Sequence, residues 1–306
     1  MVILGATASG KTKLACALAA ELNGEIISAD SRQVYRHLNL GSGKDLTEYT
    51  VAGKQIPYHL IDCADVNTQF YLHDFLDGLD RSFKDIVSRK QLPIICGGSG
   101  LYLDALHKDF SNTAITENAD LRASLEHLTN EELLDRLKAY APHLWQQVDL
   151  QSRKRVIRGI EIAEYRSSAD AQTGTYTFDN TQFKPLYIGL RDEKHRRDEK
   201  IAMRLADRLN QGLVAEVEGL LAMGIGHERL QRLGLEYKYL SLYLKQKIDY
   251  ASMVKALETA IVQFAKRQST WFRKMEKEGI NIHWLPANGN LVGHLEAIRR
   301  YLLFGE

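Results

Sequence analysis

The sequence predicts an α/β fold built on a doubly wound parallel sheet, with a helical insertion and a helix-rich C-terminal region. Three observations support this prediction. Short apolar segments alternate with amphipathic helical segments through the first half of the chain. The apolar segments end in polar or glycine-rich corners. Residues 109–172 contain helical patterns but no convincing strand.

The elements follow one another in a regular order. Five apolar segments have the length and composition of buried parallel strands, namely 2–4, 25–28, 58–61, 93–96 and 186–189. Helical patterns follow three of these strands, over 11–22, 72–88 and 100–107. The insertion carries helical patterns over 130–141 and 152–165, and the C-terminal region carries them over 198–223 and 250–278. We expect a core of residues 1–108 and 173–306, with the insertion at 109–172.

The composition is typical of a soluble globular protein. Hydrophobic residues make up 44% and charged residues 26% of the chain, which excludes a disordered or fibrous protein. The three cysteines, Cys16, Cys63 and Cys96, lie far apart in sequence, so neither a zinc site nor a disulfide framework is indicated. No apolar run approaches the roughly 20 residues that span a bilayer. We therefore expect a cytoplasmic protein without a membrane segment.

A glycine-rich octet follows the first predicted strand and opens the first predicted helix. It fits the phosphate-binding pattern G-x-x-x-x-G-K-S/T with Gly5, Ala6, Thr7, Ala8, Ser9, Gly10, Lys11 and Thr12. Glycines let backbone N–H groups face phosphate oxygens, the lysine adds a positive charge, and the threonine hydroxyl is suited to Mg²⁺. The octet therefore predicts a P-loop NTPase-like fold. The octet alone does not say which phosphate compound it binds.

Polar residues follow three further strands, at the edge where doubly wound sheets bind ligands. Asp30 ends the second strand and is a candidate general base, although an aspartate there is also typical of a helix cap. Asp62 ends the third strand like the acidic residue that holds Mg²⁺ in other P-loop enzymes, but it is equally typical of a turn. Ser99, within a glycine-rich segment after the fourth strand, lies either at the same crevice or in a plain turn.

Basic residues gather in clusters, although the formal net charge is only +1. One cluster spans Arg153 to Arg158, and another spans Lys266 to Arg273 and includes Trp271. Cations beside an aromatic ring suit RNA phosphates and unstacked bases. Each cluster, taken alone, is also typical of a solvated helix face.

Six segments in chain order resemble the tRNA dimethylallyltransferase family. They are GATASGKT, ISADSRQVYR, YHLID, GGSGLYL, RKRVIRGIEI and AKRQSTWFR, and together they span most of the chain. The resemblance implies transfer of a dimethylallyl group from dimethylallyl diphosphate to the exocyclic amine of the adenosine at position 37 of tRNA, beside the anticodon. It also implies Mg²⁺ as a cofactor and a monomer that binds the anticodon stem-loop.

The resemblance also implies roles for individual residues. Gly5 to Thr12 would bind the diphosphate, Lys11, Thr12 and Arg204 would assist its departure, Thr12 would hold the metal, and Asp30 would accept the amine proton. Contacts with tRNA would fall on the insertion and on both sides of the crevice, at Asp30, Ser31, Arg32, Gln33, Ser99, Arg122, Lys154, Arg155, Val156, Ile157, Arg158, Lys266, Arg267, Gln268, Trp271 and Arg273.

The chain departs from the family's pattern at three places. Ala6 replaces the usual proline of the loop, and Ser99 replaces a threonine. The segment Gly234-Leu235-Glu236-Tyr237-Lys238 replaces a tighter Gly-Tyr-Lys/Arg sequence next to the basic tail. Glu236 would add negative charge where a phosphate contact is expected, so a contact of Lys238 or Arg232 with tRNA does not follow from the resemblance.

Three other functions stay open at this point. An adenylate isopentenyltransferase uses the same loop with a free nucleotide as acceptor, and the basic clusters favour tRNA over that alternative. A P-loop small-molecule kinase is a second alternative, and an RNA-binding protein that uses nucleotide as a conformational switch is a third. Neither of these two explains the segment Asp30-Ser31-Arg32-Gln33.

Overall fold

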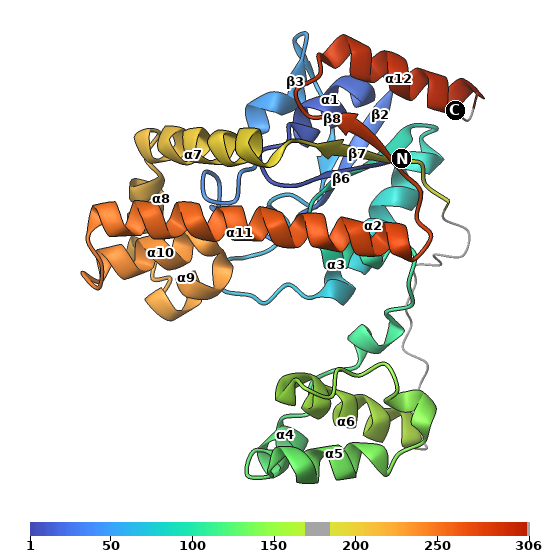
Figure 1. The fold of residues 1–306 in the computed structure, drawn as a ribbon, viewed down its shortest axis with the longest axis vertical. Coiled ribbons are helices and arrows are strands. Elements are labelled where there is room, and N and C mark those ends of the chain that lie inside the picture. Colours follow the sequence, from blue (N-terminus) through green and yellow to red (C-terminus); the bar gives the residue numbers. More distant parts are fainter. Residues whose placement is uncertain (169–183, 305–306) are drawn as a thin grey trace. The chain divides into compact units, whose positions relative to one another are not determined.

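The computed structural model describes residues 1–168 and 184–304, which belong to two compact units. The first unit comprises Met1–Lys108 and Asn180–Glu306, and the second comprises Asp109–Asp179. Among the described residues, every strand belongs to the first unit, whereas the second unit holds helices (Figure 1).

A six-stranded parallel sheet forms the centre of the first unit and confirms the predicted α/β fold. Its order is β5-β2-β6-β1-β7-β8, with bounds Val2–Gly5 (β1), Gly24–Ala29 (β2), Tyr58–His59 (β5), Leu92–Gly97 (β6), Tyr187–Arg191 (β7) and Ile282–Pro286 (β8). β1 lies in the middle, where Ile3 is aligned with Cys96 of β6 and Ile188 of β7. Strands buried on both faces read as continuous apolar runs, which is why β1, β2 and β6 could be predicted. A separate hairpin pairs Thr50–Val51 (β3) with Lys54–Gln55 (β4).

Strand β8 was not predicted, because the sequence beyond residue 190 shows clear patterns only for helices. Its five residues add to the edge of the sheet beside β7. Trp284 of β8 lies 4.1 Å below the guanidinium of Arg191, and its Nε1 donates to Glu276 Oε1 at 2.7 Å. Arg191 lies 93 positions before Trp284, so no local pattern indicates the pairing of β8 with β7.

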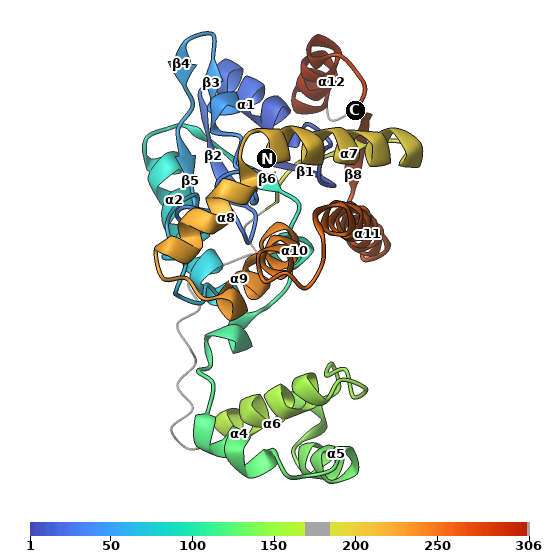
Figure 2. The same cartoon turned by 90° about the vertical axis from the view of Figure 1, so that its left-hand side faces the viewer.

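Helices cover both faces of the sheet. α1 (Lys11–Leu22) and α12 (Leu291–Phe304) lie on one face, and α2 (Leu72–Ser88) and α11 (Tyr250–Lys277) lie on the other (Figure 2). The bounds of α1 and α2 agree with the predicted ones. α3 (Gly100–Asp104) is shorter than predicted. The predicted helix over 198–223 is in fact two, α7 (Lys194–Asn210) and α8 (Leu213–Ala222), because Gly212 has a left-handed φ of 99° between them.

Two further helices, α9 (His227–Leu233) and α10 (Leu235–Leu244), pack with α7, α8 and α11 around a second apolar core. That core also takes in Val34, Tyr35 and Leu38 from the segment after β2. It therefore joins the helical region to the carboxyl edge of the sheet. A 3₁₀ turn, η1 (Leu46–Tyr49), lies against α1.

The second unit contains α4 (Ala119–Leu125), α5 (Asn130–Lys138) and α6 (Arg153–Ser167), with 3₁₀ turns η2 (Ser111–Ala114) and η3 (Pro142–Leu144). A capping box between Thr129 and Glu132 starts α5. The unit has its own core of buried aliphatic side chains, made up of Leu121, Leu125, Leu133, Leu137, Val156 and Ile160.

Candidate active site

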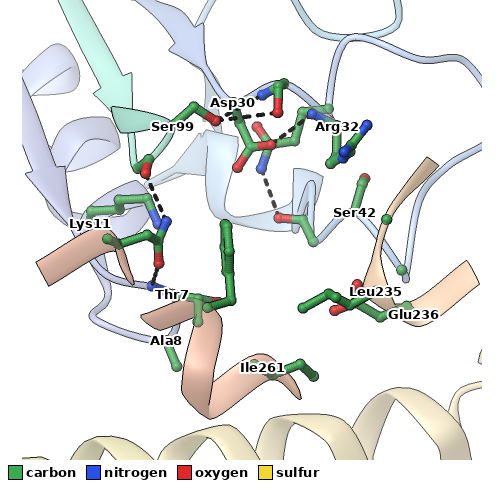
Figure 3. Close-up of a pocket in the computed structure, with 18 of the residues that line it drawn as sticks. Thr7, Ala8, Lys11, Asp30, Arg32, Ser42, Ser99, Leu235, Glu236 and Ile261 are labelled. Carbon is green, nitrogen blue, oxygen red and sulfur yellow. Dashed lines mark hydrogen bonds between the residues drawn. The ribbon is translucent and has the colours of Figure 1, made fainter. Parts of the chain in front are cut away.

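A crevice of about 810 Å³ opens beside the carboxyl ends of the central strands (Figure 3). Its lining residues directly follow β1, β2 and β6, at 7–12, 30–33 and 98–102. The rest of the lining comes from the segment 41–48 and from α7, α9, α10 and α11. In a doubly wound sheet this edge is the usual position of a ligand.

The loop after β1 has the backbone geometry of an anion cradle. Ala8 and Gly10 adopt left-handed conformations, with φ of 63° and 81°, and the Ser9 N–H donates to the Ala6 carbonyl at 3.3 Å. This conformation is unfavourable for alanine, so the surrounding structure must hold it, as is common at functional sites. Gly10 then caps α1, whose N-terminal N–H groups and positive dipole end face the crevice.

Two side chains of the cradle lack partners among the described residues. Ser9 Oγ is buried and forms no hydrogen bond. Lys11 Nζ forms neither a hydrogen bond nor an ion pair within that same set of residues. Burial lowers the pKa of Lys11, while the acidic groups of Cys96, Asp30 and Asp45 act in the opposite direction. A lysine held in such a position is satisfied best by an added oxyanion.

Asp30 faces the crevice from the end of β2 (Figure 3). Its Oδ1 accepts from the Arg32 N–H at 2.9 Å, so one oxygen stabilises a turn, while Oδ2 is the oxygen left for a ligand. The sequence allowed Asp30 to be a helix cap, but the residues that follow it form a turn and not a helix. The Ser31 N–H donates to Ser99 Oγ at 3.1 Å, which holds the segments after β2 and β6 together.

Gln268 is buried and holds the cradle, whereas the resemblance implies a contact with tRNA; that contact stays a prediction. The Thr7 N–H donates to Gln268 Oε1 at 2.9 Å, and Gln268 Nε2 donates to the Gly98 carbonyl at 2.8 Å. Only 6% of the residue is exposed. Gln268 therefore links α11 to the two loops that carry the phosphate cradle and Ser99. Gln33 is similarly occupied, since its Nε2 donates to the Gly43 carbonyl at 3.0 Å.

The rest of the basic tail is more accessible. Lys266, Arg267 and Arg273 are exposed on α11. Trp271 packs so closely against Gly100 that a Cβ there would collide with the indole ring, and Lys274 Nζ lies 5.0 Å from the ring centroid. Trp271 Nε1 is buried without a hydrogen-bond partner in the described part of the chain. The ring therefore forms one wall of the crevice.

In the second unit, Glu161 organises the arginines that the sequence assigned to tRNA. Arg122 Nε and Nη2 donate to its two oxygens at 2.8 and 2.9 Å, and Arg158 Nη1 donates to Oε2 at 3.2 Å. The Glu161 side chain is only 1% exposed. The pattern of exposed cations in α6 does not reveal this buried partner, so Glu161 was missed.

Other residues assigned to tRNA in this unit have different surroundings. Val156 is 2% exposed and belongs to the core of the second unit, and Ile157 packs against that core. The tRNA contact that the resemblance implies for these two positions stays a prediction. Arg155 pairs with Asp149 at 2.7 Å. Lys154 is exposed and forms no ion pair with any described residue.

The segment that departs from the family's pattern is turned into the protein. Tyr237 is fully buried and donates to Glu216 Oε1 at 2.8 Å. Glu236 lines the crevice, where its Oε1 lies 3.9 Å from Arg208 Nη1, and burial raises the pKa of its carboxyl. Arg232 and Lys238 are exposed and also line the crevice. The Glu236 carboxylate therefore lies near a positive charge of the protein itself, the Arg208 guanidinium.

Of the two strand-end aspartates considered as site residues, Asp30 lines the crevice and Asp62 does not. The Asp62 Oδ1 accepts from Lys44 Nζ at 2.5 Å, and the Asp62 φ of 54° is that of a turn. Asp45 and Glu48 do line the crevice. Asp45 accepts from Arg204 Nη2, and burial raises the pKa of Glu48. Asp45 and Glu48 lie outside any phosphate-binding pattern, so sequence reasoning missed them.

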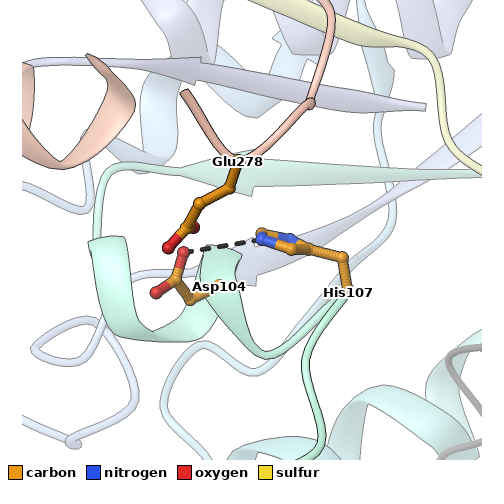
Figure 4. A group of neighbouring side chains, drawn as sticks. All are labelled: Asp104, His107 and Glu278. Atoms are coloured by element: carbon orange, nitrogen blue, oxygen red, sulfur yellow. Dashed lines mark ion pairs between the residues drawn. The ribbon is translucent and has the colours of Figure 1, made fainter. Parts of the chain in front are cut away.

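A second polar cluster lies outside the crevice, at the end of α11. Asp104, His107 and Glu278 bring potential metal ligands within 4.8 Å of one another (Figure 4). Lys108 Nζ already donates to Asp104 Oδ2 at 3.0 Å and to Glu278 Oε2 at 2.6 Å, and Lys274 Nζ lies 3.7 Å from Asp104 Oδ2. Two ammonium groups offset the two carboxylates, so the cluster is best described as an ion-pair network that fastens α11 to α3.

Within the described ranges, no helix has both the length and the apolarity needed to cross a membrane.

Comparison with known proteins identifies relatives along nearly the whole chain. A sequence profile described as IPP transferase matches residues 33–275. The chain is 47% identical over 288 residues to tRNA dimethylallyltransferase 2 of Bacteroides fragilis, covering 94% of this chain and 92% of the relative. It is 44% identical over 300 residues to tRNA dimethylallyltransferase 1 of Geotalea uraniireducens, covering 98% and 96%.

Solved structures agree with these sequence relatives. The full-length tRNA isopentenylpyrophosphate transferase of Bacillus halodurans superposes with a TM-score of 0.71 at 29% identity, covering 98% of this chain and 94% of that one. The corresponding transferase of Staphylococcus epidermidis gives a TM-score of 0.69 at 30% identity, covering 100% and 98%. By profile, sequence and fold, the chain belongs to the IPP transferase family, the family of the tRNA dimethylallyltransferases.

Proposed function

We propose that this chain transfers the dimethylallyl group of dimethylallyl diphosphate to the exocyclic amine of the adenosine at position 37 of tRNA. One observation carries the proposal: a phosphate cradle and a carboxylate line the same crevice, and among the described residues neither the cradle's lysine nor one oxygen of the carboxylate has a partner. A prenyl transfer to an amine needs both groups, one to accept the leaving diphosphate and one to accept a proton. The relatives named above carry the same activity in their names.

The cradle is suited to the diphosphate of the donor. The N–H groups at the start of α1 and the Lys11 ammonium face the crevice, and Arg204 faces it from α7. As the allylic C–O bond breaks, its electron pair stays with the diphosphate, whose negative charge grows. Donors already in place around that charge stabilise the transition state more than the bound substrate.

The oxygen donors of the crevice fit Mg²⁺ as a cofactor. The Thr12 hydroxyl and the Glu48 carboxylate both line it, and hard cations of this size prefer such oxygens together with phosphate oxygens. Thr12 would hold the ion, with Glu48 as an additional carboxylate candidate in the same crevice. When bound, Mg²⁺ offsets negative charge on the diphosphate.

Asp30 is placed to take the proton. The lone pair of an adenine amine is delocalised into the ring, so the amine becomes a good nucleophile only as its proton leaves. The amine nitrogen forms a bond to the allylic carbon, the carbon–oxygen bond to diphosphate breaks, and the amine proton passes to the Asp30 carboxylate. The hydrogen bond from Arg32 to Oδ1 fixes the direction in which Oδ2 points.

Recognition of tRNA is proposed for the exposed basic residues. Lys266, Arg267 and Arg273 on α11 offer charges to phosphates, and Trp271 offers an aromatic surface beside the crevice. In the second unit, Lys154 is exposed and has no ion-pair partner in the part of the chain that the structure describes, so it is available for such a contact. The target base must leave its stack to reach a crevice of this kind. We further propose a cytoplasmic location, because the three cysteines are free, and a monomer, because the family resemblance implies one.

Replacement of Asp30 by Asn tests the proposed base. The amide retains an acceptor for the Arg32 N–H but cannot accept the amine proton, so we expect turnover to fall by roughly 10² to 10⁴-fold with tRNA affinity little changed. Asp65→Asn is the matched control, because Asp65 Oδ1 accepts from Asn67 N–H in a similar turn and does not line the crevice. Near-normal turnover of Asp30→Asn in single-turnover assays would remove Asp30 from the mechanism.

A further inference from the structure

An ion-pair network lies in the same crevice as the phosphate cradle. Arg204 and Arg208 are four residues apart on α7, so their guanidinium groups share one face of the helix. Both approach the carboxylate of Asp45: Arg204 Nη2 donates to Oδ2, and Arg208 Nη2 lies 3.8 Å from Oδ1. One carboxylate thus lies between two arginines, each facing a different oxygen.

The backbone around Asp45 is bent to bring its carboxylate there. Asp45 has a left-handed conformation with φ of 45° and ψ of 49°. Gly43 is also left-handed, with φ of 68°, and a Cβ at this position would collide with Arg208 Nη2 and lie 2.9 Å from Arg204 Nη2. A non-glycine residue in the left-handed region is unfavourable and persists where the surroundings hold it. The arginines and the loop therefore fit together closely.

The cationic side chains on the two sides of the crevice differ in whether they have hydrogen-bond or ion-pair partners. On the cradle side, Lys11 Nζ and Ser9 Oγ lack partners within the described residues. On the α7 side, Asp45 engages Arg204 and Arg208, and Glu236 lies 3.9 Å from Arg208. The two sides are close enough that the charges of both Asp45 and Arg204 act on Lys11. An oxyanion bound at the cradle would therefore lie near the carboxylate of Asp45 and compete with it for the same guanidinium groups.

We propose that Asp45 substitutes for the donor's diphosphate in the free enzyme, holding Arg204 and Arg208 until the diphosphate takes both over. Arg208 is then a second diphosphate-binding arginine. The inference rests on the proposed function, since it needs a diphosphate in this crevice. Guanidinium groups bind phosphate oxygens in the same fork geometry as carboxylates, and a diphosphate carries more charge than one carboxylate. Asp45 weakens donor binding by competing with it and, for the same reason, favours release of the diphosphate product.

Calorimetric titration with inorganic diphosphate in the absence of divalent metal tests the proposal. Asp45→Asn should bind diphosphate about 2- to 5-fold more tightly than the unaltered chain, the scale expected for losing a partly exposed competing ion pair. Glu48→Gln is the matched control: it removes a carboxylate from the same crevice that has no arginine partner within 4 Å among the described residues. Its effect should be clearly smaller than that of Asp45→Asn.

A double-mutant cycle separates competition from simple loss of charge. If Asp45 acts through the arginines, the gain from Asp45→Asn should disappear in an Arg204→Gln, Arg208→Gln background. A gain of the same size in that background overturns the proposal, as does unchanged or weaker binding by Asp45→Asn. Weaker binding would identify Asp45 as a residue that orients Arg204.

Two further measurements keep the test decisive. If Asp45→Asn fails to fold, as judged by circular dichroism, Arg208→Gln alone should weaken diphosphate binding about 10-fold, and no weakening would overturn the role of Arg208. If the folded, unaltered chain binds no diphosphate and transfers no label from dimethylallyl diphosphate, the proposed function itself fails. Normal binding by the unaltered chain with no effect of Asp45→Asn refutes only the competition.

Discussion

Replacement of Gln268 by Leu tests the view that this residue holds the cradle. Leucine has a similar volume, so the change removes two hydrogen bonds without opening a large cavity. Each bond contributes about 1 kcal/mol net, and the buried Gly98 carbonyl left without a partner adds about 1–3 kcal/mol. The Thr7 N–H lines the crevice, where water replaces the lost acceptor. We therefore expect the free energy of unfolding to fall by about 2–4 kcal/mol.

Urea denaturation followed by circular dichroism measures that loss. Ser269→Ala is the control on the neighbouring position, because Ser269 Oγ donates only within its own helix, to the Ala265 carbonyl at 3.0 Å. It should change the free energy of unfolding by less than about 0.5 kcal/mol. If Gln268 only contacted tRNA, its replacement would weaken tRNA binding without changing the free energy of unfolding. Unchanged stability of Gln268→Leu together with weaker tRNA binding would refute the reasoning.

Two other substitutions give distinct outcomes. Lys11→Met should weaken diphosphate binding by about 10- to 100-fold, since one charge-assisted contact is lost. Because burial lowers the pKa of Lys11, the affinity of the unaltered chain should fall with rising pH before an ordinary lysine deprotonates, and calorimetry across pH should show no such step in Lys11→Met. Glu161→Gln leaves two arginines without their buried partner and should destabilise the second unit by about 2–3 kcal/mol. In a chain whose Trp271 and Trp284 are replaced by Phe, fluorescence of Trp145 during urea unfolding reports on that unit. Glu164→Gln, at an exposed pair, should have little effect.

Much of the fold could be predicted because the relevant signals are local. The buried strands β1, β2 and β6 are continuous apolar runs, and α1 begins after Gly10 and ends at Asn23, both in left-handed conformations. β8 could not be predicted in this way, because it pairs with β7 and its Trp284 packs under Arg191, both remote in sequence. The break at Gly212 was missed because the apolar period continues across it.

The residues of the candidate site likewise fall into those that local sequence indicates and those that only the tertiary structure brings together. The cradle and Asp30 follow strands directly, so position in the chain indicated position in the crevice. The burial of Gln268 could not be predicted, because a polar residue within a basic helix is expected to be exposed, whereas its amide bonds backbone groups 261 and 170 positions away. Asp45 was missed because only the fold brings it to Arg204, which is 159 positions away. Contacts of this kind require the tertiary structure.

Transfer of label from dimethylallyl diphosphate tests the central claim most directly. The purified chain is incubated with labelled donor, Mg²⁺, and a mixture of tRNA and AMP, and the products are separated. We predict that the label enters tRNA and that, after digestion to nucleosides, it lies on the exocyclic amine of the adenosine from position 37. Label found in AMP and absent from tRNA would contradict the account.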